Sequence, residues 1–284
     1  MGRREIPIAP KPEPAPSIVF EDPMIHRFFR LLFIVVAFAA ATSAHADARL
    51  LVAVSTEVLP AIQQLADDYR SQYGGPEIAL MAGSSRALYA DIRRGVPIDL
   101  FFAANLSYPA RLSDEGLATG APVIYARNEL LLWTRLPGVI SPTLDMLTDR
   151  KIHVIAIPSR YNSPFGQRAE QALREARLWP KLQAKLVTGE NVQEVARFVK
   201  NGSASAGIVT RSMLYRSEFN GLGAFSVLPA ELYKPIAQAF VMTLHGENNP
   251  AVRSFAAFVT GAAARATFVR YGYLPPQDDV AAGK

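Results

Sequence analysis

Four short loops of this chain carry residue types that could hold an anion without any positive charge. They are Ser55-Thr56-Glu57, Gly83-Ser84-Ser85, the segment 158–166 and the segment 189–192, and each lies between an apolar run and a predicted helix. The first turn of a helix has unpaired backbone N–H groups and a partial positive charge, so it can bind an anion together with nearby hydroxyl groups. Taken singly, each loop is better explained as an ordinary turn with capping residues. Four of them together favour a shared anion-binding cleft.

Strands and helices alternate along the chain, and this pattern predicts an α/β fold with mainly parallel sheets. The first alternation has predicted strands at 50–54, 78–82 and 99–103, with predicted helices at 58–69, 87–94 and 108–115. After residue 130 the alternation begins again, which indicates a second lobe. Its strands are predicted at 130–133, 153–157, 184–187 and 206–209, and its helices at 144–149, 166–176 and 192–200. A strand at 236–244 and helices at 250–259 and 261–271 complete the chain.

The N-terminal region has the three parts of a secretory signal. Residues 24–46 begin with basic residues, continue with an apolar core at 31–41, and end with the small-residue site Ala44-His45-Ala46. The exported chain is therefore expected to begin at Asp47 and to be periplasmic. A membrane anchor is the alternative, but the apolar core is too short to span a bilayer. Residues 1–23 are interpreted as an upstream mis-start or a disordered extension.

Composition argues against several functional classes. The chain has a formal net charge of +5 and no cysteine, and it contains no run of five or more Lys and Arg residues, so nucleic-acid binding is not expected. Beyond the signal only His153 and His245 remain, and His153 is expected to be a buried histidine of a core strand. No nucleophile elbow, phosphate-binding Walker loop or zinc-protease motif occurs. We expect a protein that is not an enzyme; a secreted hydrolase is the least favoured alternative.

Several segments, in order and at matching spacing, resemble the periplasmic molybdate-binding proteins of ABC importers. The resemblance extends from about residue 50 to residue 274. The segments are Val52-Ala-Val-Ser-Thr56, Gly83-Ser84-Ser85, Gly95-Val-Pro-Ile-Asp99-Leu-Phe101, Ala104-Asn105, Leu112-Ser-Asp-Glu-Gly-Leu117, Ser163-Pro164-Phe165-Gly166, Gly189-Glu-Asn-Val192, Gly207-Ile-Val209 and Phe268-Val-Arg-Tyr-Gly272.

This resemblance implies a two-lobe periplasmic binding protein fold of class II. Residues 47–129 with 236–284 would form lobe I, and residues 130–235 would form lobe II. The implied ligand is molybdate or tungstate, with no cofactor and no direct metal-ion ligand; the implied partner is an ABC importer permease, and a monomer is expected. By position, the implied ligand contacts are the Ser85 hydroxyl and the backbone N–H groups of Phe165 and Val192. Ser84, Ser55 and Thr56 complete the implied ligand-binding set, together with Glu57.

Glu57 departs from the family pattern, which has Ser or Asn at the aligned position. A carboxylate beside a dianion is repulsive, by about 4 kcal/mol for two unit charges 4 Å apart at an effective dielectric constant near 20. Three explanations remain open: Glu57 turns outward, it pairs with Arg86, or the ligand is another small anion or an organic acid contacted by Arg86, Arg160 or Glu57. A second departure, Thr210 where some relatives have tyrosine, is interpreted as tolerable.

Overall fold

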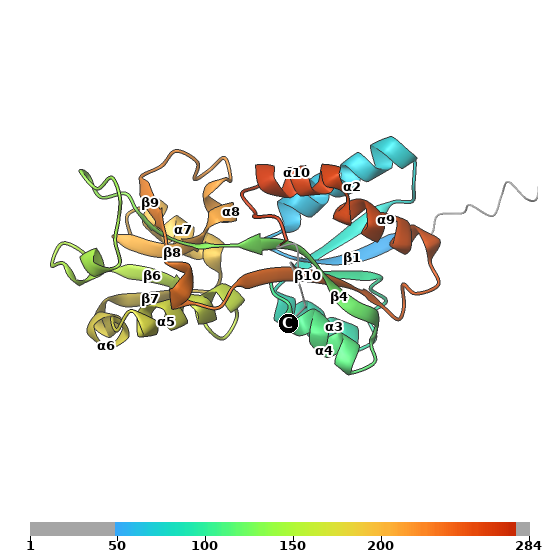
Figure 1. The fold of residues 1–284 in the computed structure, drawn as a ribbon, viewed down its shortest axis with the longest axis horizontal. Helices are drawn as coiled ribbons and strands as arrows, with labels where there is room; N and C mark the ends of the chain where they lie inside the picture. The colour runs from blue at the N-terminus through green and yellow to red at the C-terminus, as the bar shows by residue number, and fades with distance from the viewer. Residues whose placement is uncertain (1–48, 277–284) are drawn as a thin grey trace, which may run out of the picture. The chain divides into compact units, whose positions relative to one another are not determined.

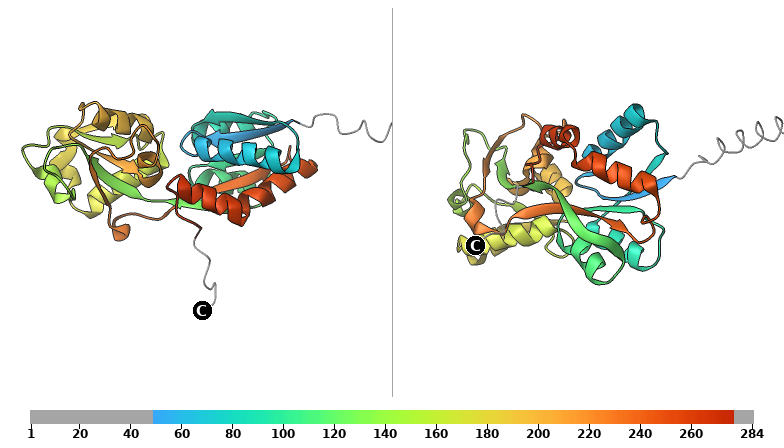
Figure 2. Two further views of the ribbon diagram at one scale, coloured as in Figure 1. Left: turned by 90° about the horizontal axis from the view of Figure 1, so that it is seen from above. Right: turned by 45° about the vertical axis from the view of Figure 1, so that its right-hand side comes forward.

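The structure is a computed structural model that describes residues 49–276, and these residues form two α/β lobes, each on its own five-stranded sheet (Figures 1 and 2). The sheet of the first lobe has the order β2-β1-β3-β10-β4, and that of the second lobe has the order β7-β6-β8-β5-β9. The strands of the first lobe are β1 Leu50–Ser55, β2 Ile78–Gly83, β3 Leu100–Ala103, β4 Ala118–Asn128 and β10 Ile236–Thr243. Those of the second are β5 Leu130–Thr134, β6 Ile155–Pro158, β7 Leu186–Gly189, β8 Ala206–Thr210 and β9 Ala224–Val227.

Both sheets are mixed, so the prediction of mainly parallel sheets is wrong in this detail. In the first sheet β1 pairs in parallel with β2 and β3, whereas β10 is antiparallel to β3 and β4. In the second, β6 is parallel to β7 and β8, whereas β5 is antiparallel to β8 and β9. The sequence analysis missed β4 and β9. Strand β4 contains Gly120 and Pro122, which resemble a turn, but proline is tolerated there because β4 is an edge strand.

Helices cover both faces of each sheet (Figure 1). In the first lobe α2 Leu59–Tyr73, α9 Pro250–Thr260 and α10 Ala262–Arg270 cover one face, and α3 Ser85–Arg93 and α4 Ser107–Asp114 cover the other. In the second lobe α5 Pro164–Glu175 and α6 Trp179–Leu182 lie opposite α7 Val192–Lys200 and α8 Arg211–Leu214. Short 3-10 turns occur at Asp145–Thr148, Gln183–Lys185 and Ala230–Leu232. Apolar side chains at helical spacing fill the space between helices and sheet, as the sequence predicts.

Two connections between the sheets join the lobes. Glu129 alone separates β4 from β5, and residues 228–235 lead from β9 back to β10. The side chain of Asn128 donates a hydrogen bond to the Ser212 hydroxyl (2.7 Å), which ties the first crossing to α8. Such short crossings keep the two sheets close together in space.

His153 is exposed and precedes β6, so the expectation of a buried strand histidine is wrong. The strand begins two residues later because the buried apolar run starts only at Ile155. The predicted signal at 24–46 and the segment 1–23 lie outside the described residues. Among residues 49–276, no helix combines the length and the apolar character needed to cross a bilayer.

Gln238 on β10 is fully buried, and neither atom of its amide has a hydrogen-bond partner among residues 49–276. A buried amide without partners costs free energy, so we expect Gln238→Met to raise the free energy of unfolding by about 1–2 kcal/mol. Urea denaturation measures this change. The exposed Gln63→Met is the control, with an expected change within about 0.5 kcal/mol. A loss of stability in Gln238→Met would mean that the amide has a partner such as a buried water.

Candidate ligand site

The first two predicted loops lie side by side at the carboxyl edge of the first sheet. The register of β1 and β2 places Ser55 opposite Gly83, where both strands end. The Thr56 N–H donates to the Gly83 carbonyl oxygen (3.0 Å), and the Thr56 hydroxyl donates to the same oxygen (3.2 Å). The sequence therefore brings Ser55-Thr56-Glu57 and Gly83-Ser84-Ser85 together, as expected for loops that follow parallel strands.

Ser85 is the first residue of α3 and is only 4% exposed. Its hydroxyl oxygen accepts a hydrogen bond from the Ala104 N–H (3.0 Å). A hydroxyl has one donor as well as its acceptor sites, so this contact leaves the Ser85 hydrogen available for an anion. The preceding Ser84 is exposed, and its oxygen caps the helix by accepting from the Ala87 N–H (3.1 Å). The two serines thus differ in what their side chains do.

The second lobe presents two helix N-termini at the carboxyl edge of its sheet. The ends of β6 and β7 are paired, and the Ser159 N–H donates to the Gly189 carbonyl oxygen (2.7 Å). Helix α5 begins just after this point, and so does α7, which is capped by the Asn191 side chain. The Phe165 and Val192 side chains are fully buried, so only their backbone can face a ligand. Within the described residues neither N–H has a hydrogen-bond partner.

Gly166 sets how closely α5 approaches the end of β6. A Cβ atom at this position would lie 2.4 Å from the Pro158 carbonyl oxygen and 2.5 Å from the Ser159 carbonyl oxygen. These are backbone atoms that no rotamer change can move aside. A residue without a side chain is therefore required beside Phe165, which gives the Pro164-Phe165-Gly166 motif a physical reason.

The edges of the two lobes contact each other through Arg216, which the sequence analysis did not single out. The Arg216 guanidinium donates to the carbonyl oxygens of Thr56 and Glu57 (3.3 Å each). A residual cavity of only about 10 Å³ lies between Thr56 and Glu57 on one side and Asn191, Gln193, Met213 and Arg216 on the other. The contact is thus closely packed. No local pattern in the sequence marks Arg216, because it acts on a loop 159 residues away.

Tyr273 also makes a hydrogen bond to the loop that contains Glu57. Its hydroxyl donates to the Glu57 carbonyl oxygen (2.8 Å). Burial raises the pKa of Tyr273 well above its usual range, so the phenol stays protonated and remains a donor. The backbone of Glu57 is therefore held from two sides.

The Glu57 carboxylate accepts a hydrogen bond from the Ser55 hydroxyl. Since the Thr56 hydroxyl bonds to Gly83, the first loop keeps its Glu57 N–H as the donor without a partner among residues 49–276. The suggested pairing of Glu57 with Arg86 is not made: Arg86 is exposed, and none of the ion pairs of the described part of the chain joins these residues. The nearby cation is Arg216, which lines the same small cavity as Glu57.

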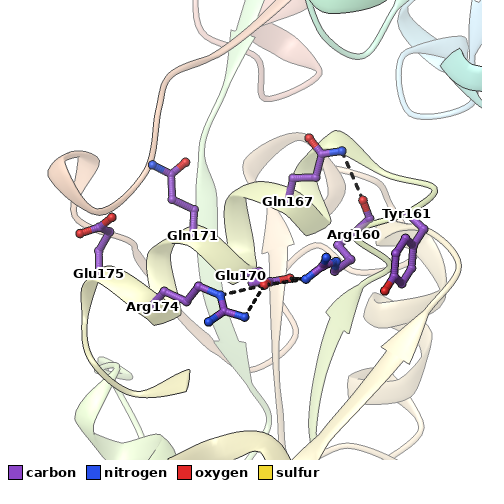
Figure 3. A pocket seen from close by; sticks show the side chains of 7 residues that line it. All are labelled: Arg160, Tyr161, Gln167, Glu170, Gln171, Arg174 and Glu175. Atoms are coloured by element: carbon purple, nitrogen blue, oxygen red, sulfur yellow. Dashed lines mark hydrogen bonds and ion pairs between the residues drawn. The ribbon is translucent and has the colours of Figure 1, made fainter. Parts of the chain in front are cut away.

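A pocket of about 560 Å³ lies along α5 and not at these edges (Figure 3). At its floor the nearly buried Glu170 accepts hydrogen bonds from Arg160 (2.8 and 2.9 Å) and from Arg174 (2.7 Å). Figure 3 shows the Arg160 side chain directed to Glu170. Arg160, suggested above as a contact for an alternative ligand, is therefore engaged in holding the loop before α5.

Catalytic and metal-binding groupings are scarce in this part of the chain. His245 bonds to Asp99 (3.0 Å), whose other carboxylate oxygen accepts from the Leu51 N–H (2.8 Å), so this pair braces β1. No cluster of three His, Asp or Glu residues suited to a metal ion occurs within residues 49–276. The sheet edges described above offer several hydrogen-bond donors, among them the Ser85 hydroxyl and the N–H groups of Phe165 and Val192.

Two α/β lobes joined by short crossings, with helix N-termini at the edges where they contact, define the architecture of a solute-binding protein. A family model described as bacterial extracellular solute-binding protein matches residues 50–274, and the chain belongs to this family. The α/β two-lobe fold predicted from the sequence is thereby confirmed.

Individual proteins named for molybdate binding are also similar to this chain. The molybdate-binding protein ModA of Azotobacter vinelandii is 29% identical over 249 residues, which are 86% of this chain and 98% of the relative. The protein of the same name from Rhodobacter capsulatus is 29% identical over 201 residues, 70% of this chain and 78% of the relative. The solved structure of the periplasmic molybdate-binding protein of Azotobacter vinelandii has a TM-score of 0.73 at 29% identity and covers 80% of this chain and 100% of that chain. The resemblance found in the sequence is confirmed.

Proposed function

We propose that this chain is the solute-binding subunit of an ABC importer and that it binds molybdate or tungstate between its lobes. One observation carries the proposal: each lobe offers uncharged donors at the edge that contacts the other. The first lobe offers the Ser85 hydroxyl, and the second offers the N–H groups of Phe165 and Val192. Helix N-termini and hydroxyl groups stabilise an anion by hydrogen bonds and peptide dipoles. The likeness to molybdate-binding relatives supports the choice of ligand.

The remaining parts of the proposal follow from this role. Residues 47–129 with 236–284 are proposed as lobe I and residues 130–235 as lobe II, a division supported by the membership of the strands in the two sheets. The chain is proposed to be periplasmic after removal of residues 24–46, to act as a monomer with a permease, to need no cofactor, and to catalyse no reaction. Ser84 is assigned to capping, and Ser55 and Thr56 to shaping the loop that presents the Glu57 N–H.

Calorimetric titration of the exported chain from Asp47 tests the proposal. Molybdate and tungstate are expected to bind with sub-micromolar dissociation constants, whereas sulfate and phosphate are expected to give no comparable heat. Cavity size would provide this discrimination, because molybdate and sulfate share charge and shape. Absence of heat with every oxyanion would contradict the proposal, and turnover of phosphate or carboxylate esters would favour a hydrolase.

A receptor for a different small anion or an organic acid is the second candidate, and Glu57 is the observation that favours it. Its carboxylate lies in the loop beside Ser85 and would repel a dianion. The Arg216 guanidinium at the same loop offsets part of this charge. The balance of these two groups decides whether the loop favours a doubly charged ligand.

Glu57→Gln removes the negative charge and keeps an amide oxygen for the Ser55 hydroxyl. We expect it to tighten molybdate binding about tenfold, or about 1.4 kcal/mol, because the repulsion is lost while the fold is kept. Calorimetry of both proteins measures the change. Glu77→Gln is the matched control, since Glu77 precedes β2 at the opposite edge of the sheet and pairs with Arg49. Equal affinities of Glu57→Gln and the parent would mean that the carboxylate does not act on the ligand.

A further inference from the structure

The backbone of Thr56 and Glu57, in the loop after β1, has two N–H groups and two carbonyl oxygens, and three of these four groups are hydrogen-bonded. The Thr56 N–H donates to the Gly83 carbonyl oxygen (3.0 Å). The carbonyl oxygens of Thr56 and Glu57 both accept from the Arg216 guanidinium (3.3 Å each), and that of Glu57 also accepts from the Tyr273 hydroxyl (2.8 Å). Only the Glu57 N–H remains without a partner among residues 49–276.

The Thr56 carbonyl group and the Glu57 N–H belong to the same peptide group. This peptide bond is trans, and a trans peptide is planar with its C=O and N–H directed opposite ways. Since the Arg216 nitrogen lies at the carbonyl oxygen, the Glu57 N–H points away from the guanidinium. A cation at the carbonyl end also polarises the peptide, because hydrogen bonds in series strengthen one another. Arg216 therefore both orients this N–H and makes it a stronger donor.

The charge of Arg216 is not cancelled by a carboxylate in contact with it. Arg216 is half-buried, yet none of the ion pairs within residues 49–276 includes it. Removing a charge from water costs free energy unless a counter-charge compensates, and a bound anion would supply one. The cavity between Arg216 and the loop is about 10 Å³, enough for one water at most, so an oxyanion does not fit between them. An effect on the ligand must therefore pass through the loop.

We propose that Arg216 is a positioning residue of the oxyanion site and acts through the Thr56–Glu57 peptide. The inference rests on the proposed function, in which the anion lies between the lobes beside Ser85. Arg216 belongs to the second lobe and fixes the orientation of this peptide of the first lobe. It also places its positive charge behind the Glu57 N–H, which donates to the oxyanion. The ligand is thus stabilised by a cation that it does not touch.

Neutralisation of the Glu57 carboxylate is the competing explanation for Arg216. The guanidinium lines the same small cavity as Glu57 and would offset its negative charge even without the peptide. The two explanations differ in a Glu57→Gln background, where the carboxylate charge is gone and the backbone N–H is kept. If Arg216 acts through the peptide, its loss still weakens binding in that background. If it acts only on the carboxylate, its loss has no further effect there.

Calorimetric titration with molybdate of the exported chain and its Arg216→Met, Glu57→Gln and doubly substituted variants tests the inference. Arg216→Met is expected to weaken binding about tenfold, both in the parent and in the Glu57→Gln background. Arg216→Lys keeps the charge and a donor, so its affinity should stay within about threefold of the parent. Arg197→Met is the matched control, because Arg197 is an exposed arginine in the last turn of α7, and it should change affinity less than about twofold.

The outcomes separate this inference from the proposed function. Parent-like molybdate affinity in Arg216→Met, or a loss confined to the parent background, overturns the inference and leaves the proposed function standing. Arg216→Lys binding as weakly as Arg216→Met also overturns it, because the loss would then not follow the charge. A parent protein that binds no oxyanion overturns both. Should the thermal midpoint show that Arg216→Met is not folded, Arg216→Gln replaces it under the same criteria; it keeps a donor without the charge, and a loss of about fivefold is expected.

Discussion

Gly166→Ala is expected to lower the free energy of unfolding by about 3 kcal/mol and to weaken oxyanion binding in the protein that remains folded. The added Cβ would lie 2.4–2.5 Å from two backbone carbonyl oxygens at the end of β6, so α5 must move away from the sheet. Overpacking of this kind typically costs 1–3 kcal/mol, and contact with backbone favours the upper end. The same displacement moves the Phe165 N–H, which couples the loss of stability to the loss of affinity.

Urea denaturation and molybdate calorimetry measure the two effects of Gly166→Ala. Glu175→Ala, at the exposed end of the same helix, is the matched control and should change stability by less than about 0.5 kcal/mol. A Gly166→Ala protein with unaltered stability and affinity would show that the close approach of α5 to β6 is not needed.

Ser85→Ala is expected to weaken molybdate binding by about 1.5–3 kcal/mol, which corresponds to roughly a 10- to 150-fold rise in the dissociation constant. The reason is the loss of a nearly buried hydroxyl whose hydrogen is available for an anion. The substitution also leaves the Ala104 N–H without its acceptor, so the thermal midpoint must be recorded to ensure that folded protein is titrated.

The control for Ser85→Ala is Ser113→Ala. The Ser113 hydroxyl lies on α4 and bonds to the Gly120 carbonyl oxygen (2.9 Å), away from the edges where the lobes contact. Its removal should leave the molybdate affinity within twofold. Parent-like affinity in Ser85→Ala would remove Ser85 from the site.

Local patterns in the sequence predict most helices and the strands with continuous apolar runs. Helix α7 begins and ends where its capping asparagine and periodicity place it, and β1 follows from the run Leu50–Val54. The sequence analysis did not predict the edge strand β4, because Gly120 and Pro122 resemble a turn. The pairing of β4 with β10 also depends on residues far away in the sequence. The mixed character of both sheets depends on such long-range pairings.

The sequence likewise predicted only part of the candidate site. The hydroxyl and glycine loops were predicted to lie together at strand ends, and the structure places them so in each lobe. What the sequence could not provide is the partner of each polar atom. Arg216 rather than Arg86 lies beside Glu57. This contact joins the two lobes, so no local pattern in the sequence predicts it.

A crystal structure of the exported chain with molybdate tests most directly whether uncharged donors of both lobes hold the anion. The account predicts molybdate oxygens at about 2.7–3.1 Å from the Ser85 hydroxyl oxygen and from the backbone nitrogens of Phe165 and Val192. It also predicts that no guanidinium contacts the oxyanion and that the Glu57 carboxylate stays bonded to Ser55. An oxyanion held by Arg86 or Arg160, with Ser85 out of reach, would contradict the account.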